Sequence, residues 1–252
     1  MLTPNPDTIS IVLAAGQGTR MKSDLAKVLH NMAGRPLIHY VMDYVLDVGF
    51  GRNIVVIGFQ KNRVREVLKG YPVEFVDQDE QLGTGHAVQL ALKQIREIDG
   101  AVAILSGDAP FLRPSTLKSL MTRHVSSGCD CTILTAAVED PAGYGRIVRD
   151  ASGNVLAIVE DVDCTEEERR VREVNSGMYC FRLPSLVSSI ELLRSDNLQD
   201  ELYLTDVVRI MHAKGMELGS FPAPDWREIL GINTIEQLRQ GEKILKDLGA
   251  CH

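Results

Sequence analysis

The sequence lacks any run of about 18 consecutive apolar residues, the length that a membrane-spanning helix requires. Residues 1–10 also lack the basic segment and apolar stretch of a secretory signal. Basic residues do not predominate, since 27 Lys and Arg stand against 34 Asp and Glu, for a net charge of −7. We therefore expect a cytoplasmic protein with no membrane partner and no nucleic-acid partner, because binding to a nucleic-acid backbone requires clustered cations.

Cysteine pairs of the C-x-x-C type are absent as well. The five cysteines are scattered along the chain, at Cys129, Cys131, Cys164, Cys180 and Cys251. This arrangement predicts reduced thiols and neither a disulfide framework nor a thiolate metal site. No internal repeat, low-complexity segment or linker interrupts the 252 residues, of which 44% are apolar and 24% charged. This composition is ordinary for a soluble protein, and the length predicts a single domain.

Short β-branched segments alternate with helical patterns in the first half of the chain. The predicted strands are apolar on both faces and cover residues 9–15, 53–57, 72–76, 101–105 and 132–138. The predicted helices between them cover residues 36–48, 83–95 and 114–126. This alternation predicts an α/β fold with a doubly wound, mostly parallel sheet.

The alternation of predicted strands and helices ends after residue 138. Three extended segments, at residues 145–149, 155–159 and 173–181, predict a smaller β-rich insertion. Helical patterns return at residues 205–214 and 234–248. The oligomeric state is not indicated by any of these patterns.

A glycine-rich turn follows the first predicted strand and carries two cations. It reads Gly16-Gln17-Gly18-Thr19-Arg20-Met21, and Lys27 follows shortly after it. Glycines allow backbone N–H groups to approach phosphate oxygens, and nearby cations can neutralise a polyphosphate. The dinucleotide-binding fingerprint needs a third glycine where Met21 stands, and the P-loop needs a Gly-Lys-Ser/Thr sequence that is absent here. These differences disfavour a nicotinamide enzyme and a P-loop NTPase.

Several further motifs follow this turn along the chain: Gln78-Asp79-Glu80-Gln81-Leu82-Gly83-Thr84-Gly85-His86, Gly107-Asp108-Ala109-Pro110, Gly143-Tyr144-Gly145-Arg146, Asn175-Ser176-Gly177 and Tyr203-Leu204-Thr205-Asp206. In this order, they resemble the sugar-phosphate nucleotidyltransferase family over residues 11–233. The resemblance is strongest to its N-acetylglucosamine-1-phosphate uridyltransferases, the pyrophosphorylase domains of bacterial bifunctional uridyltransferase/acetyltransferases. It implies a Rossmann-like nucleotidyltransferase fold. Within one domain of residues 1–252, we expect a nucleotide-binding core at about 7–138, a sugar-binding part at about 139–233 and a terminal helix at 234–248.

The resemblance implies a reaction in which UTP and N-acetylglucosamine 1-phosphate form UDP-N-acetylglucosamine and pyrophosphate. Its implied catalytic residues are Arg20, Lys27 and Asp108. Asp108 and Asn233 would bind Mg²⁺, a hard cation that prefers oxygen ligands. Two alternatives remain open, namely the same chemistry with another sugar 1-phosphate or dTTP, and a non-catalytic regulatory protein that binds a sugar nucleotide.

The resemblance also assigns substrate contacts. The substrates would meet Leu13, Ala14, Ala15, Gly16, Lys27, Gln78, Gln81, Gly83, Thr84, Ser106, Gly107, Asp108, Gly145, Glu160, Asn175, Tyr203, Thr205 and Asn233. Among these, Gln78 and the turn at Gly83 and Thr84 resemble the segment that reads the base, and Gly145, Glu160, Asn175, Tyr203 and Thr205 match positions around the sugar. His86 is interpreted as structural or as a minor phosphate neighbour.

The sequence departs from the family pattern at three places. Ser106 replaces a tyrosine, Ala26 replaces a proline before Lys27, and Asp161-Val162 replaces a common His-Lys pair. These departures leave the sugar preference open. Only residues 234–252 follow Asn233, so we expect this chain to lack the acetyltransferase β-helix domain of the bifunctional enzymes.

Overall fold

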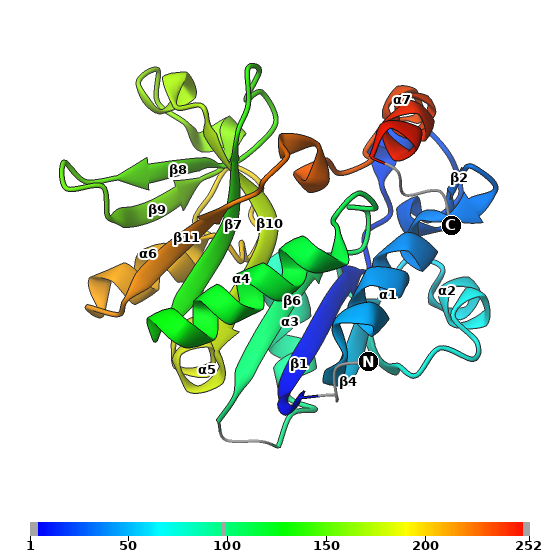
Figure 1. Ribbon diagram of the computed structural model, residues 1–252, viewed down its shortest axis with the longest axis horizontal. Helices are drawn as coiled ribbons and strands as arrows, with labels where there is room; N and C mark the ends of the chain where they lie inside the picture. Colours follow the sequence, from blue (N-terminus) through cyan, green and yellow to red (C-terminus); the bar gives the residue numbers. More distant parts are fainter. Residues whose placement is uncertain (1–4, 97–98, 249–252) are drawn as a thin grey trace.

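A mixed β-sheet of nine strands forms the centre of the computed structural model, which describes residues 5–96 and 99–248 (Figure 1). Seven strands follow one another in the order β11-β7-β10-β6-β1-β4-β5, and β8 and β9 lie off this path. The strands of this sheet are β1 (Asn5–Ala14), β4 (Phe50–Ile57), β5 (Glu74–Asp77), β6 (Ala101–Ser106), β7 (Cys131–Ala137), β8 (Arg146–Arg149), β9 (Val155–Val159), β10 (Glu173–Arg182) and β11 (Leu218–Pro222). A separate small hairpin joins β2 (Asn31–Met32) to β3 (Arg35–Pro36).

Strand β1 lies between β6 and β4 and runs parallel to both. Its residue Val12 pairs with Val55 on one side and with Leu105 on the other. Alternate side chains of β1 enter different hydrophobic cores, because successive residues of a strand point to opposite faces. Val12 contributes to one core and Ile11 to the other, and both are fully buried. The predicted α/β class with a mostly parallel, doubly covered sheet is thus confirmed.

Helices cover both faces of the sheet. Helices α1 (Leu37–Val48) and α4 (Pro114–Ser127) lie on the near face in Figure 1, and α3 (Thr84–Leu92), α5 (Leu183–Ile190) and α6 (Asp206–Ala213) lie on the far face. The short helix α2 (Lys61–Val67), in which Val64 is the only buried residue, is an element that the sequence patterns do not predict. The 3₁₀ turns are η1 (Thr19–Met21), η2 (Lys27–Leu29), η3 (Asp161–Asp163), η4 (Glu168–Arg170) and η5 (Trp226–Ile229).

Strand β10 differs from the prediction. The sequence places it in a β-rich insertion, whereas in the structure it lies inside the main sheet, antiparallel to β6 and β7. Tyr179 of β10 pairs with Ile104 on one side and Ile133 on the other. Its apolar pattern predicts burial, but periodicity does not identify the partner strands. Only the β8–β9 hairpin extends beyond the main path, and it joins β10 at the pair Val174–Arg146.

Helix α7 (Ile235–Asp247) packs against the hairpin segment through a third hydrophobic cluster that includes Met32 and Phe111. Its first turn carries a capping box, in which Thr234 Oγ1 accepts a hydrogen bond from the Gln237 N–H at 3.1 Å. Gln237 Oε1 in turn accepts from the backbone N–H of Asn233 at 2.7 Å. The start of α7 therefore fixes the backbone of Asn233.

Close backbone packing explains the glycine at position 85. The Gly85 N–H donates to the Leu202 carbonyl at 2.7 Å, and a Cβ at this position would lie 2.8 Å from that oxygen and 2.4 Å from Leu193 Cδ1. Overpacking of this kind costs about 1–3 kcal/mol. The higher helix propensity of alanine would increase the free energy of unfolding by at most about 1 kcal/mol.

We expect Gly85→Ala to lower the free energy of unfolding, because the clash outweighs the gain in helix propensity. Urea denaturation measures the change, with Arg123→Ala on the exposed face of α4 as the control. The control should stay within about 0.5 kcal/mol of the wild type. An unchanged denaturation midpoint for Gly85→Ala would show that the Leu202 segment can move away.

Candidate active site

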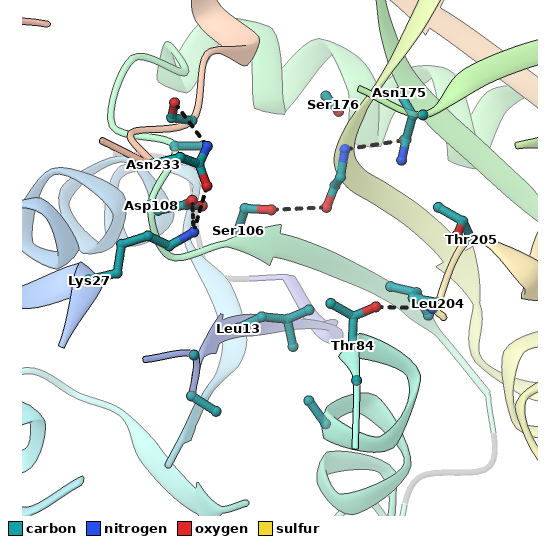
Figure 2. A pocket seen from close by; sticks show the side chains of 18 of the residues that line it. Leu13, Lys27, Thr84, Ser106, Asp108, Asn175, Ser176, Leu204, Thr205 and Asn233 are labelled. Carbon is teal, nitrogen blue, oxygen red and sulfur yellow. Dashed lines mark hydrogen bonds and ion pairs between the residues drawn. The ribbon is translucent and has the colours of Figure 1, made fainter. Parts of the chain in front are cut away.

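A cavity of about 460 Å³ opens at the carboxyl ends of strands β1 and β6 (Figure 2). In open α/β sheets, ligands bind at this end of the strands. The predicted site residues that line the cavity are Leu13, Ala14, Ala15, Gly16, Arg20, Lys27, Gln78, Gln81, Gly83, Thr84, Ser106, Asp108, Gly145, Glu160, Asn175, Thr205 and Asn233. Residues from distant parts of the sequence thus meet around one space.

Two cations and two oxygen-bearing side chains converge at one end of the cavity. The Lys27 ammonium forms an ion pair with Asp108, and its Nζ lies 3.1 Å from Asn233 Oδ1. Arg20 Nη2 donates to the same Asn233 oxygen at 2.8 Å. Figure 2 shows Lys27, Asp108 and Asn233 pointing toward one another from three separate segments. This end of the cavity therefore carries the charge that an anionic ligand requires.

The two glycines of the first turn, Gly16 and Gly18, serve different structural roles. A Cβ at Gly18 would lie 2.6 Å from the Lys27 Cβ, and the backbone there has a φ of 75°, so glycine allows the lysine segment to pack closely. A Cβ at Gly16 would meet no atom within 4 Å. Gly16 lines the cavity, so its bare backbone faces open space that a ligand can approach.

The donor set at Asp108 and Asn233 fits a hard divalent cation. A carboxylate and an amide oxygen are ligands that Mg²⁺ accepts, with phosphate and water oxygens completing its octahedron. Both oxygens already converge on a positive charge, because the Lys27 ammonium contacts each of them. Among the described residues, no group of three or more His, Cys, Asp and Glu side chains is arranged to hold a metal ion.

The Gln78 side chain is buried, and its amide nitrogen is occupied by the protein itself. Gln78 Nε2 donates to the Gly83 carbonyl at 3.1 Å and lies 3.2 Å from His86 Nδ1. The latter contact supports the structural interpretation of His86, which does not line the cavity. Gln81 Nε2 donates to the Gln78 carbonyl at 3.3 Å, so the two glutamines stabilise the turn that precedes α3.

Polar side chains at the other end of the cavity are joined by hydrogen bonds. The Thr205 hydroxyl donates to Glu160 Oε1 at 2.9 Å, and Asn175 Nδ2 donates to the Tyr179 hydroxyl at 2.8 Å. Burial raises the pKa of Glu160 above its ordinary value, and the hydrogen bond from Thr205 opposes this shift only in part. Nearby Asp163 raises the Glu160 pKa further. A set of acceptors and donors of this kind suits a ligand that carries hydroxyl groups.

Two predicted residues do not line the cavity. Gly107 is buried beneath it, where its N–H donates to the Leu13 carbonyl at 2.9 Å and where a Cβ would lie 2.7 Å from that oxygen. Tyr203 is buried and donates its hydroxyl to Gln199 Oε1 at 2.7 Å. Burial and the neighbouring carboxylates, with Asp163 and Glu160 foremost, raise the pKa of Tyr203 to about 12.

The cavity also has lining residues that the sequence interpretation did not assign. They are Val28, Ala87, Ala109, Gly143, Tyr144, Ser176, Gly177, Tyr179, Glu201, Leu204, Ile229 and Gly231. Five of them directly adjoin a predicted residue, namely Val28, Ala109, Tyr144, Ser176 and Leu204, so the motif context pointed to their neighbourhood. Tyr179 is different, because strand β10 bulges between Asn175 and Tyr179, with Gly177 at a φ of 75°. A bulge redirects side chains in a way that strand alternation does not reveal.

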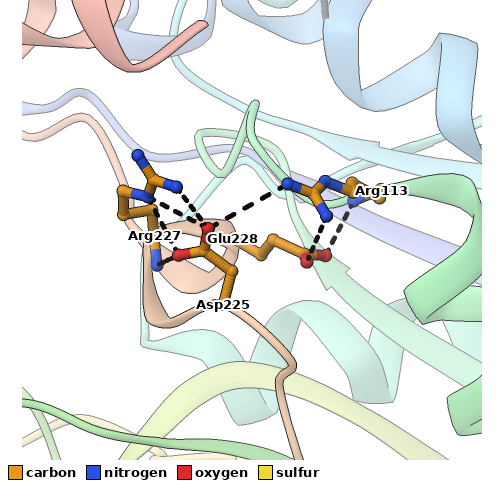
Figure 3. A network of polar contacts seen from close by, with 4 residues as sticks. All are labelled: Arg113, Asp225, Arg227 and Glu228. Carbon is orange, nitrogen blue, oxygen red and sulfur yellow. Dashed lines mark hydrogen bonds and ion pairs between the residues drawn. The ribbon is translucent and has the colours of Figure 1, made fainter. Parts of the chain in front are cut away.

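A buried carboxylate braces the segment that carries Asn233 (Figure 3). Glu228 of η5 is 0% exposed, and its Oε2 accepts a hydrogen bond from the backbone N–H of Arg113 at 3.1 Å. Arg113 Nη1 lies 3.8 Å from Glu228 Oε1. Arg113 precedes α4, so the carboxylate also lies at a helix N-terminus, where negative charge is favoured. The Ile232 N–H donates to the Asp108 carbonyl at 2.9 Å. This hydrogen bond is a second link between the segment that precedes α4 and the segment that carries Asn233.

We expect Glu228→Ala to lower the free energy of unfolding by about 1–3 kcal/mol, because it leaves the partly buried Arg113 N–H without its acceptor. Glu228→Gln keeps an acceptor oxygen and should cost less than Glu228→Ala. Urea denaturation of both variants provides the measurement. Equal stability of the wild type and Glu228→Ala would contradict a bracing role.

Within the described residues, no helix is both long enough and apolar enough to span a membrane. Comparison with known families matches residues 10–177 to the MobA-like NTP transferase domain. The resemblance to nucleotidyltransferases expected from the motifs is confirmed by this match.

Individual relatives extend the similarity over most of the chain. The chain is 43% identical over 238 residues to the Bifunctional protein GlmU of Geobacillus sp. (strain WCH70), covering 94% of this chain and 52% of the relative. It is 45% identical over 239 residues to the Bifunctional protein GlmU of Clostridium botulinum (strain Eklund 17B / Type B), with the same two shares. The chain spans about half the length of these curated relatives.

Proposed function

The chain belongs to the MobA-like NTP transferase family, and from this premise we propose that it transfers the uridylyl group of UTP to N-acetylglucosamine 1-phosphate. The products are UDP-N-acetylglucosamine and pyrophosphate. The observation that supports the proposal is the polarity of one cavity, with cations beside a bare glycine backbone at one end and hydroxyl-recognising side chains at the other.

The reaction needs no covalent intermediate with the protein. An oxygen of the sugar phosphate attacks the α-phosphorus of UTP in line, the new oxygen–phosphorus bond forms, and the bond to the β-phosphate breaks. The electron pair of the broken bond leaves with pyrophosphate. The protein therefore contributes position and charge, which are the main sources of rate in such transfers.

The charges at the cation end match this task. Arg20 and Lys27 would bind the phosphate oxygens, and Gly16 would present its backbone to them. Asp108 and Asn233 would hold a divalent cation, for which we propose Mg²⁺. When bound, this cation offsets the negative charge that develops on the phosphates.

The other end of the cavity would orient the sugar. Glu160 and Asn175 carry polar atoms beside the backbone of Gly145, where a Cβ would lie 2.9 Å from Ile158 Cγ2. The carboxylate of Glu160 would accept hydrogen bonds from sugar hydroxyls, and a wrong sugar would leave this buried group unpaired. Gln78 Oε1 remains as the acceptor that its side chain could offer to the uracil N–H.

We expect Asp108→Asn to reduce the turnover number by roughly 10³-fold or more, because it removes the carboxylate that pairs with Lys27 at the cation end. The measurement is pyrophosphate release, with UTP, CTP, ATP and dTTP each paired with N-acetylglucosamine 1-phosphate or glucose 1-phosphate, in Mg²⁺ or EDTA. Asp43→Asn is the matched control, since Asp43 of α1 pairs with Arg35 of β3 and does not line the cavity.

Three outcomes of this experiment would change the proposal. An Asp108→Asn enzyme that keeps more than about a tenth of the wild-type rate would exclude Asp108 as an essential ligand, since that loss is only about 1.4 kcal/mol. A preference for glucose 1-phosphate would change the substrate and keep the chemistry. No pyrophosphate from any pair would favour the regulatory alternative.

The raised pKa of Glu160 predicts a pH dependence of sugar binding. As the pH falls, a carboxyl with a raised pKa takes up its proton at a higher pH than an ordinary glutamate, whose pKa is about 4.3. Protonation removes an acceptor, so we expect the KM for the sugar phosphate to rise on acidification. It should not reduce the stability of the fold, because the native state then binds this proton more tightly than the unfolded state.

Steady-state kinetics of the wild type and Glu160→Gln between about pH 5 and 8 measure this effect. The glutamine keeps an oxygen for Thr205 but cannot titrate, so its KM should be higher at neutral pH and vary less with pH. Titration of the sugar phosphate itself affects both enzymes equally. The same pH profile in both enzymes would exclude Glu160 as the group responsible.

A further inference from the structure

Arg146 is a buried cation that the proposed chemistry does not use. It begins β8, is 2% exposed and does not line the cavity. Its Nη2 donates to Asp161 Oδ1 at 2.8 Å, and its Nη1 donates to the Tyr144 carbonyl. Its Nε has no hydrogen-bond partner among the described residues. Because a buried charge is costly, the guanidinium depends on these two partners.

Asp161 completes a closed set of contacts. Its carboxylate accepts a hydrogen bond from Arg146 Nη2 at 2.8 Å. Burial would raise the pKa of Asp161, but the hydrogen bond from Arg146, the nearby backbone of Gly143 and the charge of Arg146 outweigh it and keep the pKa below its ordinary value. Asp161 is therefore ionised at neutral pH. Asp161 also stands at one of the positions where the sequence departs from the family pattern.

The partners of this pair adjoin the sugar end of the cavity. The loop of residues 143–145 and Glu160 line the cavity, and Asp161 directly follows Glu160. A Cβ placed on Gly145 would lie 3.5 Å from Glu160 Oε2 and 3.5 Å from Asn175 Cβ. The Gly145 carbonyl accepts the Asn175 N–H at 2.8 Å. Any displacement of the loop relative to β9 therefore changes the distances among the three groups assigned to the sugar.

We infer that Arg146 and Asp161 are positioning residues, which hold the 143–145 loop against Glu160 and thereby set the geometry of the sugar-phosphate half of the cavity. This inference rests on the proposed function for the identity of the ligand. The pair touches no substrate and acts through Gly145 and Glu160. Its removal should weaken binding of the sugar phosphate more than binding of UTP, because within the described residues no hydrogen bond or ion pair of Arg146 and Asp161 involves Arg20, Lys27 or Asn233.

The neighbouring ion pair on the same strand provides a matched control. Arg149 Nε donates to Glu173 Oε2 at 2.8 Å, and its Nη2 donates to Glu173 Oε1 at 2.7 Å. Neither residue lines the cavity. Arg149→Lys weakens this bidentate ion pair and Glu173→Gln removes its negative charge, and among the described residues no hydrogen bond joins either side chain to the 143–145 loop.

Steady-state kinetics of Arg146→Lys and Asp161→Asn test the inference beside these controls. We expect the KM for N-acetylglucosamine 1-phosphate to rise about tenfold or more, since misplacement of binding groups by about 1 Å can cost about 100-fold. The KM for UTP should change less than about twofold, and the controls should keep both values. Asp161→Glu keeps the charge and should restore part of the sugar affinity.

Hydrogen–deuterium exchange supplies a readout that does not depend on the reaction. In Arg146→Lys, peptides covering residues 143–146 and 158–163 should exchange faster, and peptides covering residues 13–28 should not change. If the wild type shows no uridylyl transfer but these peptides still exchange faster in Arg146→Lys, the positioning role of the pair is supported and the proposed function fails. Unchanged exchange in Arg146→Lys would overturn the inference. The same would follow if the affinities for both substrates fell equally in the test and control variants. Neither result would contradict the uridylyl transfer.

Discussion

The contact of one ammonium group with two oxygen-bearing side chains connects the parts of this structure. Lys27 follows the glycine-rich turn, Asp108 follows strand β6, and Asn233 precedes α7, and these three side chains meet at one end of the cavity. Each of these elements must be held in place by its own packing. Gly18 makes room for the lysine segment, the Glu228–Arg113 contact braces the segment before Asn233, and the capping box of α7 holds the Asn233 backbone.

The two ends of the cavity are formed by different kinds of structural element. The cation end depends on parallel strands, whose carboxyl ends meet at one edge of the sheet. The sugar end depends on the antiparallel strand β10 and on the β8–β9 hairpin, whose loops project over the same edge. Contacts between these segments include the Arg146–Asp161 ion pair, whose arginine side chain is 2% exposed.

The sequence predicts the parts of this arrangement that are local. The alternation of β1, β4 and β6 with helices, and the turn with Arg20 and Lys27, lie in short segments whose patterns carry enough information. Asn233 and the sugar-side residues were assigned only through the family resemblance, because nothing near them in sequence indicates their partners. The position of β10, and the burial of Glu228 and Arg146, depend on contacts between distant segments, which periodicity does not encode.

The place of β10 in the main sheet determines how this protein can be divided. Adjacent strands lie about 4.8 Å apart, so removal of β10 would separate β6 and β7 by the width of a missing strand. Strand β7 would then keep only β11, which comes still later in the chain. A fragment that ends after β7 would expose the unpaired backbone of β6 and would not be an autonomous nucleotide-binding unit. A chimera that takes the sugar-binding half from a relative must therefore also take β10 from that relative. A change of sugar specificity made in this way also changes a central strand of the sheet.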